Sequence, residues 1–134
     1  MKIYLDTSVI SALFDERNPE RKALTEEFFS TLSSYKVYVS ELTLAEIEKT
    51  PDPSLREKMR EIVSLFSVLE IDEKAEKYME DAYHIAVAVV NEMDYLLSWN
   101  FRHIVRKRTK DIVRMVNTLK NLKHVEIITP GEMV

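Results

Sequence analysis

Short apolar runs alternate along this chain with longer segments in which apolar residues recur every three or four positions. The short runs, at residues 2–5, 37–40, 68–71, 95–98 and 125–128, are rich in Val, Ile, Leu and Tyr, which favours β-strands. The third run could instead extend the helix before it. Because strands separated by helices pair in parallel, the pattern predicts an α/β fold, a three-layer α/β/α sandwich around a central parallel sheet of four to five strands.

Capping residues mark where helices are expected to begin. Asn18 followed by Pro19 is typical of a helix start. The apolar residues Leu24, Phe28 and Leu32 then follow at a spacing of four. This spacing predicts a helix with one apolar stripe.

Two further helix starts have the spacing of a capping box, in which a hydroxyl residue is followed three positions later by Glu. The pairs are Thr43 with Glu46 and Ser54 with Glu57. Residues 73–91 predict a long helix whose second half is apolar on nearly every side. A helix of that kind is expected to be buried within the domain.

The last helix is expected to be capped by Thr109. Its apolar stripe consists of Ile112, Met115, Val116 and Leu119, which recur at helical spacing.

Composition narrows the classes of function. The chain has 134 residues and no cysteine, which excludes disulfides, thiolate zinc sites and cysteine nucleophiles. Its single glycine excludes phosphate-binding loops that need several. The longest apolar run, residues 85–90, is far shorter than the roughly 20 residues of a membrane span, and Asp6 argues against a signal peptide. We expect one cytoplasmic domain, residues 1–134, with no membrane contact.

Two polar residues stand at predicted strand ends. Asp6 follows the first strand and Asn100 follows the fourth. In an open parallel sheet, ligands bind beyond the carboxyl ends of the strands, so both residues are expected in one crevice. Two structural alternatives remain open: Asp6 could only cap the next helix, and Asn100 could be a turn residue.

Two more acidic residues lie on predicted helices. Glu46 shares a partly apolar face with Leu42 and Ala45, and Asp81 opens a strongly apolar segment. Burying a carboxylate is costly unless a cation or a hydrogen-bond donor pairs with it. Alternatively, Glu46 completes the capping box with Thr43, and Asp81 lies at an exposed rim.

Taken together, these four positions predict a metal site. Asp6, Glu46, Asp81 and Asn100 would supply oxygen ligands without thiolates, and such ligands suit Mg²⁺ or Mn²⁺. These ions orient water and neutralise phosphate oxygens in phosphodiester cleavage. His84 lies three residues after Asp81 and is expected to be a packed helix histidine rather than a ligand.

Basic residues cluster after the fourth predicted strand. The net charge of −4 argues against coating long nucleic acid by bulk charge. A local patch beside an acidic metal site would still hold a polyanion. The candidate RNA-binding residues are Arg102, Arg106, Lys107 and Arg108, with a solvated helix face as the alternative.

Several segments in a fixed order carry a family resemblance. They are IYLDTSVI at residues 3–10, SELTLAEI at 40–47, DAYHIA at 81–86, LLSWNFRHI at 96–104 and VEIITP at 125–130. In these motifs the chain resembles a PIN domain, in particular the compact single-domain VapC-like toxins. The resemblance covers almost the whole length and implies a three-layer α/β/α sandwich.

The resemblance also implies an activity and its residues. It implies an Mg²⁺- or Mn²⁺-dependent ribonuclease whose metal is held by Asp6, Glu46 and Asp81, with Asn100 at the fourth, usually acidic, position of the site. The family position of Ser8 carries a small hydroxyl residue. Ser98 and His103 are expected to orient groups at the rim of the site. The implied partners are an RNA substrate, a small antitoxin protein and a second copy of the chain in a homodimer.

Our leading hypothesis is an endoribonuclease that is the toxin of a toxin–antitoxin pair. Asn100 motivates an alternative, because it removes one charge from the site: a catalytically weakened PIN-like module that binds RNA or a protein without turnover. A receiver-type phosphoacceptor domain ranks last, because Asp6 has no acidic neighbour in sequence.

Overall fold

A five-stranded parallel sheet forms the centre of this computed structural model, which describes residues 1–71 and 80–134, with side chains in the second range from residue 82. The strand order is β3-β2-β1-β4-β5, so β1 lies in the middle and pairs in parallel with β2 and β4. The strands are β1 (Lys2–Leu5), β2 (Lys36–Ser40), β3 (Ser67–Leu69), β4 (Tyr95–Leu97) and β5 (Glu126–Ile128).

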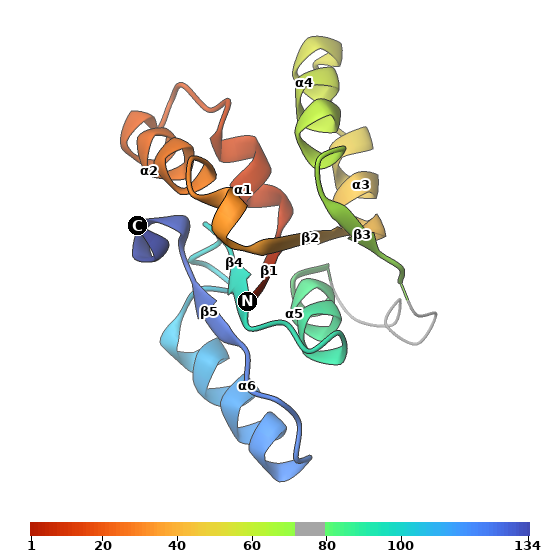
Figure 1. Cartoon of the computed structure of the whole chain (residues 1–134), viewed down its shortest axis with the longest axis vertical. Helices are drawn as coiled ribbons and strands as arrows, with labels where there is room; N and C mark the ends of the chain where they lie inside the picture. Colours follow the sequence, from red (N-terminus) through yellow and green to blue (C-terminus); the bar gives the residue numbers. More distant parts are fainter. Residues whose placement is uncertain (72–79) are drawn as a thin grey trace.

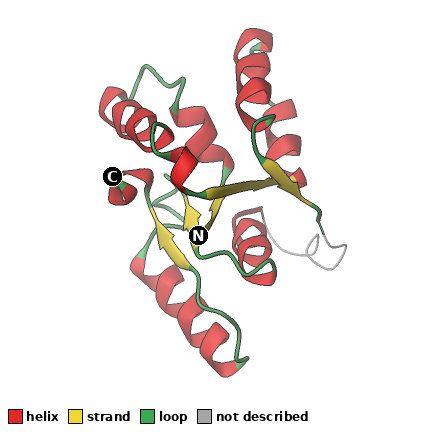
Figure 2. Cartoon of the chain, in the orientation of Figure 1, coloured by secondary structure: helices red, strands yellow, loops and turns green. Residues whose placement is uncertain are grey.

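Helices cover both faces of this sheet (Figures 1 and 2). The upper half of Figure 1 contains α1 (Thr7–Ala12), α2 (Pro19–Phe29), α3 (Glu41–Glu48) and α4 (Pro53–Val63). The lower half contains α5 (Glu80–Val90) and α6 (Lys107–Leu119), and the short helices η1 (Leu32–Ser34) and η3 (Pro130–Met133) complete the described elements. The predicted three-layer α/β/α fold is therefore confirmed.

Alternating strand residues build a separate core on each face of the sheet. Ile3 and Leu5 of β1 pack in one buried cluster with Phe28 of α2. Tyr4, between them in sequence, points to the other face and packs with Val87 of α5. Successive strand side chains point to opposite faces, so β1 contributes to both cores and is fully buried from Ile3 to Leu5.

The start of α3 differs from the sequence prediction. Ser40, the last residue of β2, is the N-cap of α3 and forms a capping box with Thr43. Glu46 is not part of this box, so the capping-box interpretation of Glu46 was wrong. The helix begins directly after the strand, which moves the cap three residues toward the N-terminus.

The start of α4 also differs. Asp52 is its N-cap, and its carboxylate accepts hydrogen bonds from the backbone N–H groups of Ser54 at 2.9 Å and Leu55 at 3.4 Å. Pro53 then occupies the first helical position, where a missing N–H costs nothing. The capping box predicted for Ser54 and Glu57 was therefore wrong, and the N-cap of α4 lies two residues closer to the N-terminus than predicted.

The apolar stripe of α6 faces solvent in the single chain. Ile112, Met115, Val116 and Leu119 are exposed by 46%, 57%, 37% and 78% of their surface. The helix begins at Lys107, with Arg106 at the N-cap, so the predicted cap at Thr109 was also wrong. The periodicity predicted an apolar face correctly, but it does not determine whether another element covers that face.

The helix α5 is less buried than its composition indicates. Val87 and Ala88 are buried against the sheet, whereas Val90 is 73% exposed. The predicted helix began at residue 73, and residues 72–79 lie outside the described part of the chain. Among the described residues, no helix has the length and apolar character needed to cross a bilayer.

Candidate active site

Asp6 is a buried carboxylate at the carboxyl end of the central strand. It follows β1 directly, is only 3% exposed, and caps α1 by accepting a hydrogen bond from the Val9 N–H at 3.4 Å. Hydroxyl groups bind both carboxylate oxygens: Ser8 donates to Oδ1 and Ser98 donates to Oδ2, each at 2.5 Å. Asp6 is thus a helix cap and also lies at the predicted site.

The two serines connect Asp6 to the loop after β4. The backbone N–H of Trp99 donates to Ser8 Oγ, and the backbone N–H of Asn100 donates to Ser98 Oγ, both at 2.9 Å. Because each serine oxygen accepts from the loop, its own hydrogen is directed to Asp6. Ser8 and Ser98, both predicted to support the site, therefore lie against its first carboxylate.

Burial raises the pKa of the Asp6 carboxyl above its ordinary value, while the charge of His84 and the hydrogen bonds from Ser8, Ser98 and the Val9 N–H oppose that shift. An ionised carboxylate at this depth is costly without a nearby positive charge. The surroundings of Asp6 therefore favour a cation at this edge of the sheet.

Glu46 joins the site from α3. Its Oε1 accepts hydrogen bonds from Thr7 Oγ1 at 2.8 Å and from His84 Nε2 at 2.6 Å. Partial burial by itself raises the pKa of Glu46, but the hydrogen bond and charge of His84, together with Thr7, lower the pKa below its ordinary value. Glu46 is therefore held in its ionised form beside the residue that follows Asp6.

His84 links Glu46 to the core of the molecule. This buried side chain of α5 contacts the Tyr4 hydroxyl through Nδ1 at 2.6 Å, and Tyr4 in turn contacts Ser40 Oγ at 2.8 Å. Since an ionised carboxylate only accepts, Nε2 donates to Glu46. The prediction of a packed, hydrogen-bonded helix histidine is confirmed. Burial raises the pKa of Tyr4, which therefore stays a neutral hydroxyl.

Sequence reasoning missed Tyr4 and Thr7. Tyr4 looked like one more apolar strand residue, although its hydroxyl needs a partner once it is buried. Thr7 adjoins Asp6, and its hydroxyl points across to another helix. The available signal was their position within three residues of Asp6 at the end of a buried strand.

The structure says less about the other predicted site residues, Asp81, Asn100 and His103. Asp81 lies in the first turn of α5, and its side chain is outside the described part of the structure. Asn100 Oδ1 accepts a hydrogen bond from the backbone N–H of His103 at 2.9 Å, as a turn asparagine does. His103 itself is exposed. The catalytic roles of Asp81 and Asn100 and the orienting role of His103 stay predictions.

The donor set fits a hard divalent cation. Asp6 and Glu46 offer carboxylate oxygens, and such oxygens have lone pairs beyond those that accept the hydroxyl and imidazole hydrogens. Within the described residues no three acidic, His or Cys side chains gather into a metal cluster. The third predicted ligand, Asp81, is the side chain that the structure leaves out.

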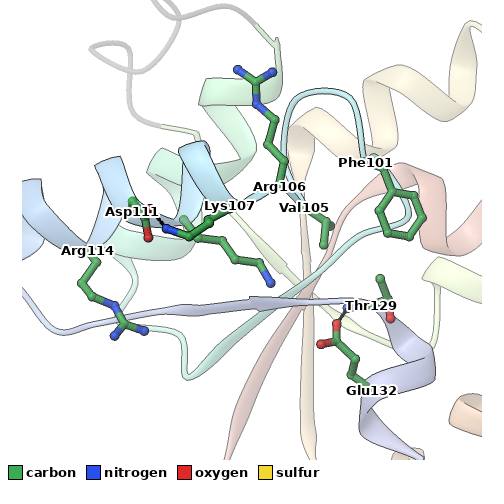
Figure 3. Close-up of a pocket in the computed structure, with 9 residues that line it drawn as sticks. Phe101, Val105, Arg106, Lys107, Asp111, Arg114, Thr129 and Glu132 are labelled. Atoms are coloured by element: carbon green, nitrogen blue, oxygen red, sulfur yellow. Dashed lines mark hydrogen bonds and ion pairs between the residues drawn. The ribbon is translucent and has the colours of Figure 1, made fainter.

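The predicted basic residues lie beside a surface hollow of about 600 Å³ next to β5 and α6 (Figure 3). Arg106 and Lys107 line it, whereas Arg102 and Arg108 are exposed residues outside its lining. Lys107 pairs with Asp111 at 2.6 Å.

Comparison with known proteins places the chain in a family. Residues 3–100 match the model of the PIN domain, so the chain belongs to the PIN domain family. Among solved structures, it is similar to a chain in the crystal structure of VapBC2 from Rickettsia felis bound to a DNA fragment from their promoter. The TM-score is 0.58 at 12% identity, over 95% of this chain and 97% of that chain. This likeness shows a shared fold, and no curated protein sequence matches.

Proposed function

We propose that this PIN domain is an endoribonuclease that requires Mg²⁺ or Mn²⁺ and that it is the toxin of a toxin–antitoxin pair. The observation that carries the proposal is the buried Asp6 carboxylate, bound by two serines, with the ionised Glu46 beside it. Both lie at the carboxyl edge of a parallel sheet, where ligands bind in this class of fold.

Each described residue has a defined task in this proposal. Asp6 and Glu46, together with Asp81, would hold the ion. Ser8 and Ser98 keep both oxygens of Asp6 in one orientation, and His84 keeps Glu46 ionised. When bound, Mg²⁺ or Mn²⁺ lowers the pKa of water and neutralises charge on a phosphate oxygen. Hydrolysis of the phosphodiester bond then requires the RNA to lie along this edge.

The proposed partners follow from the family and from the structural neighbour. That neighbour is a VapBC2 assembly bound to promoter DNA, which supports a small antitoxin as the partner of this chain. We further propose a homodimer that acts in the cytoplasm. The exposed apolar side chains of α6 are compatible with contacts to another protein.

Cleavage of a mixed RNA pool tests the activity. Wild type with Mn²⁺ or Mg²⁺ is expected to cut RNA, and EDTA is expected to stop it. Asp6→Asn removes the charge but keeps the size of the side chain, and a loss of at least a hundredfold in cleavage rate is expected, on the order of other losses of electrostatic catalysis. Glu61→Gln, on the exposed face of α4, is the matched control. Full activity in Asp6→Asn would overturn the assignment.

Asn100 favours a second candidate function. Its amide oxygen already accepts a hydrogen bond from the His103 N–H, and the amide brings no negative charge to the site. The alternative is therefore a PIN domain that binds RNA or a protein partner without turnover. Asn100→Asp separates the two proposals: cleavage only in this variant, with none in wild type, would establish the binding module.

A further inference from the structure

The hollow beside β5 has an aromatic wall that the proposed cleavage site does not use. Phe101 lines it and is 51% exposed. The Arg21 guanidinium lies 5.7 Å from the centre of the Phe101 ring and 5.2 Å from that of Trp99. Arg21 and Trp99 therefore contact the Phe101 ring, while half of the residue's surface remains open to a ligand.

The opposite wall carries positive charge from α6. Figure 3 shows Lys107, Asp111 and Arg114 on that wall, across the hollow from Phe101 and Glu132, with the Lys107 ammonium directed toward Asp111. Four cations line the hollow against two carboxylates: Arg106, Lys107, Lys110 and Arg114 against Asp111 and Glu132. The hollow is therefore locally positive, although the whole chain has a net charge of −4.

The cations differ in how strongly they are already paired. Lys107 is bonded to Asp111 at 2.6 Å, and Arg114 lies 3.7 Å from Glu126. Lys110 has no ion pair within the described part of the chain. Lys110 is thus the cation best able to bind an incoming anion without first losing a protein partner.

The hollow adjoins the candidate active site along the same edge of the sheet. Phe101 directly follows Asn100, and the backbone of Ser98, whose hydroxyl binds Asp6, pairs with Ile128 of β5. Thr129, the next residue, lines the hollow. Since neighbouring strands are about 4.8 Å apart, a chain-like ligand that crosses Asp6 reaches the hollow within a short step.

We propose that this hollow binds a nucleotide of single-stranded RNA that flanks the cleaved bond, an inference that rests on the proposed function. The Phe101 ring stacks on the base, and Lys110 binds the phosphate. An aromatic face combined with a lysine that has no ion pair within the described residues suits single-stranded nucleic acid, because every base has a flat face and every linkage carries a charge. A phosphate-only ligand would leave the Phe101 ring without a function.

RNA binding in EDTA tests the hollow independently of cleavage. The probe is a fluorescently labelled single-stranded RNA oligomer, and anisotropy gives its Kd. Phe101→Leu is expected to weaken binding about tenfold, the usual loss for one stacked base, whereas Phe101→Tyr is expected to bind as wild type does. Equal affinity of wild type and Phe101→Leu would overturn the proposal.

The role of Lys110 is tested against another lysine at the far end of the same helix. Lys110→Ala is expected to weaken binding several-fold and to reduce the slope of log Kd against log salt by about 0.7, one phosphate contact on a single strand. Lys120→Ala removes the same charge at the C-terminal end of α6, outside the hollow, and is expected to change binding less. An equal loss in both variants would show diffuse attraction and overturn the role of Lys110.

A second readout locates the base directly. An oligomer that contains 5-iodouridine is irradiated with wild-type protein, and the crosslinked peptide is identified by mass spectrometry. A crosslink at Phe101 supports the proposal, and crosslinks confined to other segments oppose it.

The two proposals can fail separately. If the protein cuts no RNA but its RNA binding depends on Phe101, the proposed nuclease activity is wrong and the proposed binding role of the hollow stands. If the protein cuts RNA and Phe101→Leu leaves cleavage unchanged, the nuclease proposal stands and the proposed binding role of the hollow is wrong.

Discussion

Hydroxyl groups hold both described carboxylates of this site. Ser8 and Ser98 bind Asp6, and Thr7 binds Glu46. Glu46 also accepts a hydrogen bond from His84 Nε2 at 2.6 Å, and the charge of His84 lowers the pKa of Glu46. The hydroxyl hydrogen bonds to Asp6 orient that carboxylate without neutralising it, so its negative charge stays available to a cation. A lysine or arginine in the same place would satisfy the carboxylate and compete with a metal ion.

Tyr4→Phe tests the chain of hydrogen bonds behind Glu46. The change removes the hydroxyl that contacts His84 and Ser40 but keeps the buried ring. We expect unfolding free energy to fall by about 1–2 kcal/mol, because two buried polar groups each lose a partner. We also expect slower RNA cleavage, because His84 is less firmly oriented toward Glu46.

Urea unfolding followed by circular dichroism gives the stability, and the RNA assay gives the rate. Tyr35→Phe is the control, because the Tyr35 ring stacks on Phe28 at 6.5 Å and Tyr35 precedes the N-terminal end of β2, opposite the edge that carries the site. A Tyr4→Phe protein as stable as wild type would contradict the described network.

Helices that begin directly at strand ends bring the site together. The helix α1 starts one residue after β1 with Asp6 as its cap, and α3 starts directly after β2 with Ser40 as its cap. Because β1 and β2 are parallel neighbours, both caps lie at the same edge of the sheet. The short connections leave little freedom for Asp6 and Glu46 to move apart.

The cap of α4 can be tested with two neighbouring variants. Asp52→Ala removes the carboxylate that binds two backbone N–H groups, and we expect it to lower unfolding free energy by about 1 kcal/mol. Ser54→Ala is expected to change stability by less than about 0.5 kcal/mol, the usual effect of a surface substitution. Urea unfolding of both variants measures the difference in unfolding free energy. A larger loss in Ser54→Ala than in Asp52→Ala would show that Ser54, the cap predicted from sequence, is the residue that caps α4.

Asp94 makes stability depend on pH. Its carboxylate accepts a hydrogen bond from the Lys2 N–H at 2.7 Å and pairs with Lys123 at 2.9 Å. The Lys2 N–H, followed by Lys123, lowers the pKa of Asp94 below its ordinary value. The folded pKa lies below the unfolded pKa of about 3.9, so this stabilisation is present above pH of about 4 and is lost as pH falls through the folded pKa.

Asp94→Asn is therefore expected to flatten the acid side of the stability profile. At neutral pH the variant loses about 1 kcal/mol, a modest value because the carboxylate is partly exposed. Below the folded pKa, wild type and variant should converge. Thermal unfolding across a pH series measures this, and a constant difference at every pH would contradict it.

At the scale of the whole molecule, the parallel sheet collects polar residues from distant parts of the sequence. Asp6, Glu46, His84 and Ser98 come from four different elements or their ends and meet at one edge of the sheet. Each parallel strand ends at that edge, so residues that follow different strands become neighbours. The site therefore forms only when the sheet forms.

Metal binding is expected to stabilise the whole fold. A ligand that binds only the folded state at a free concentration of 100 times its Kd adds about 2.7 kcal/mol, which corresponds to a melting temperature higher by roughly 10 °C for a domain of this size. We expect Mn²⁺ to raise the melting temperature of wild type and EDTA to reverse the increase. Asp6→Asn is expected to show little response, and an equal response would place the ion elsewhere.

Local sequence patterns were sufficient to predict most of the strands, and they also singled out the first acidic residue of the site. The run at residues 2–5 predicted β1 at its observed bounds, and Asp6 stood out because it ended that run. The N-caps of the helices were harder to predict from the sequence. Ser40 and Thr43 are both acceptable caps for α3, and Asp52 and Ser54 are both acceptable caps for α4. Which one acts depends on where the preceding strand or turn ends.

The sequence by itself determined the alternation of strands and helices, the parallel α/β class and the polar residues Asp6 and Asn100 at strand ends, because these follow from periodicities of two and 3.6 residues and from short-range capping. Only the tertiary structure decided that Glu46 pairs with His84, that Tyr4 supports this pair, and that the stripe of α6 is exposed. Such partners are far apart along the chain, and the packing of the whole sheet, rather than any local pattern, selects them.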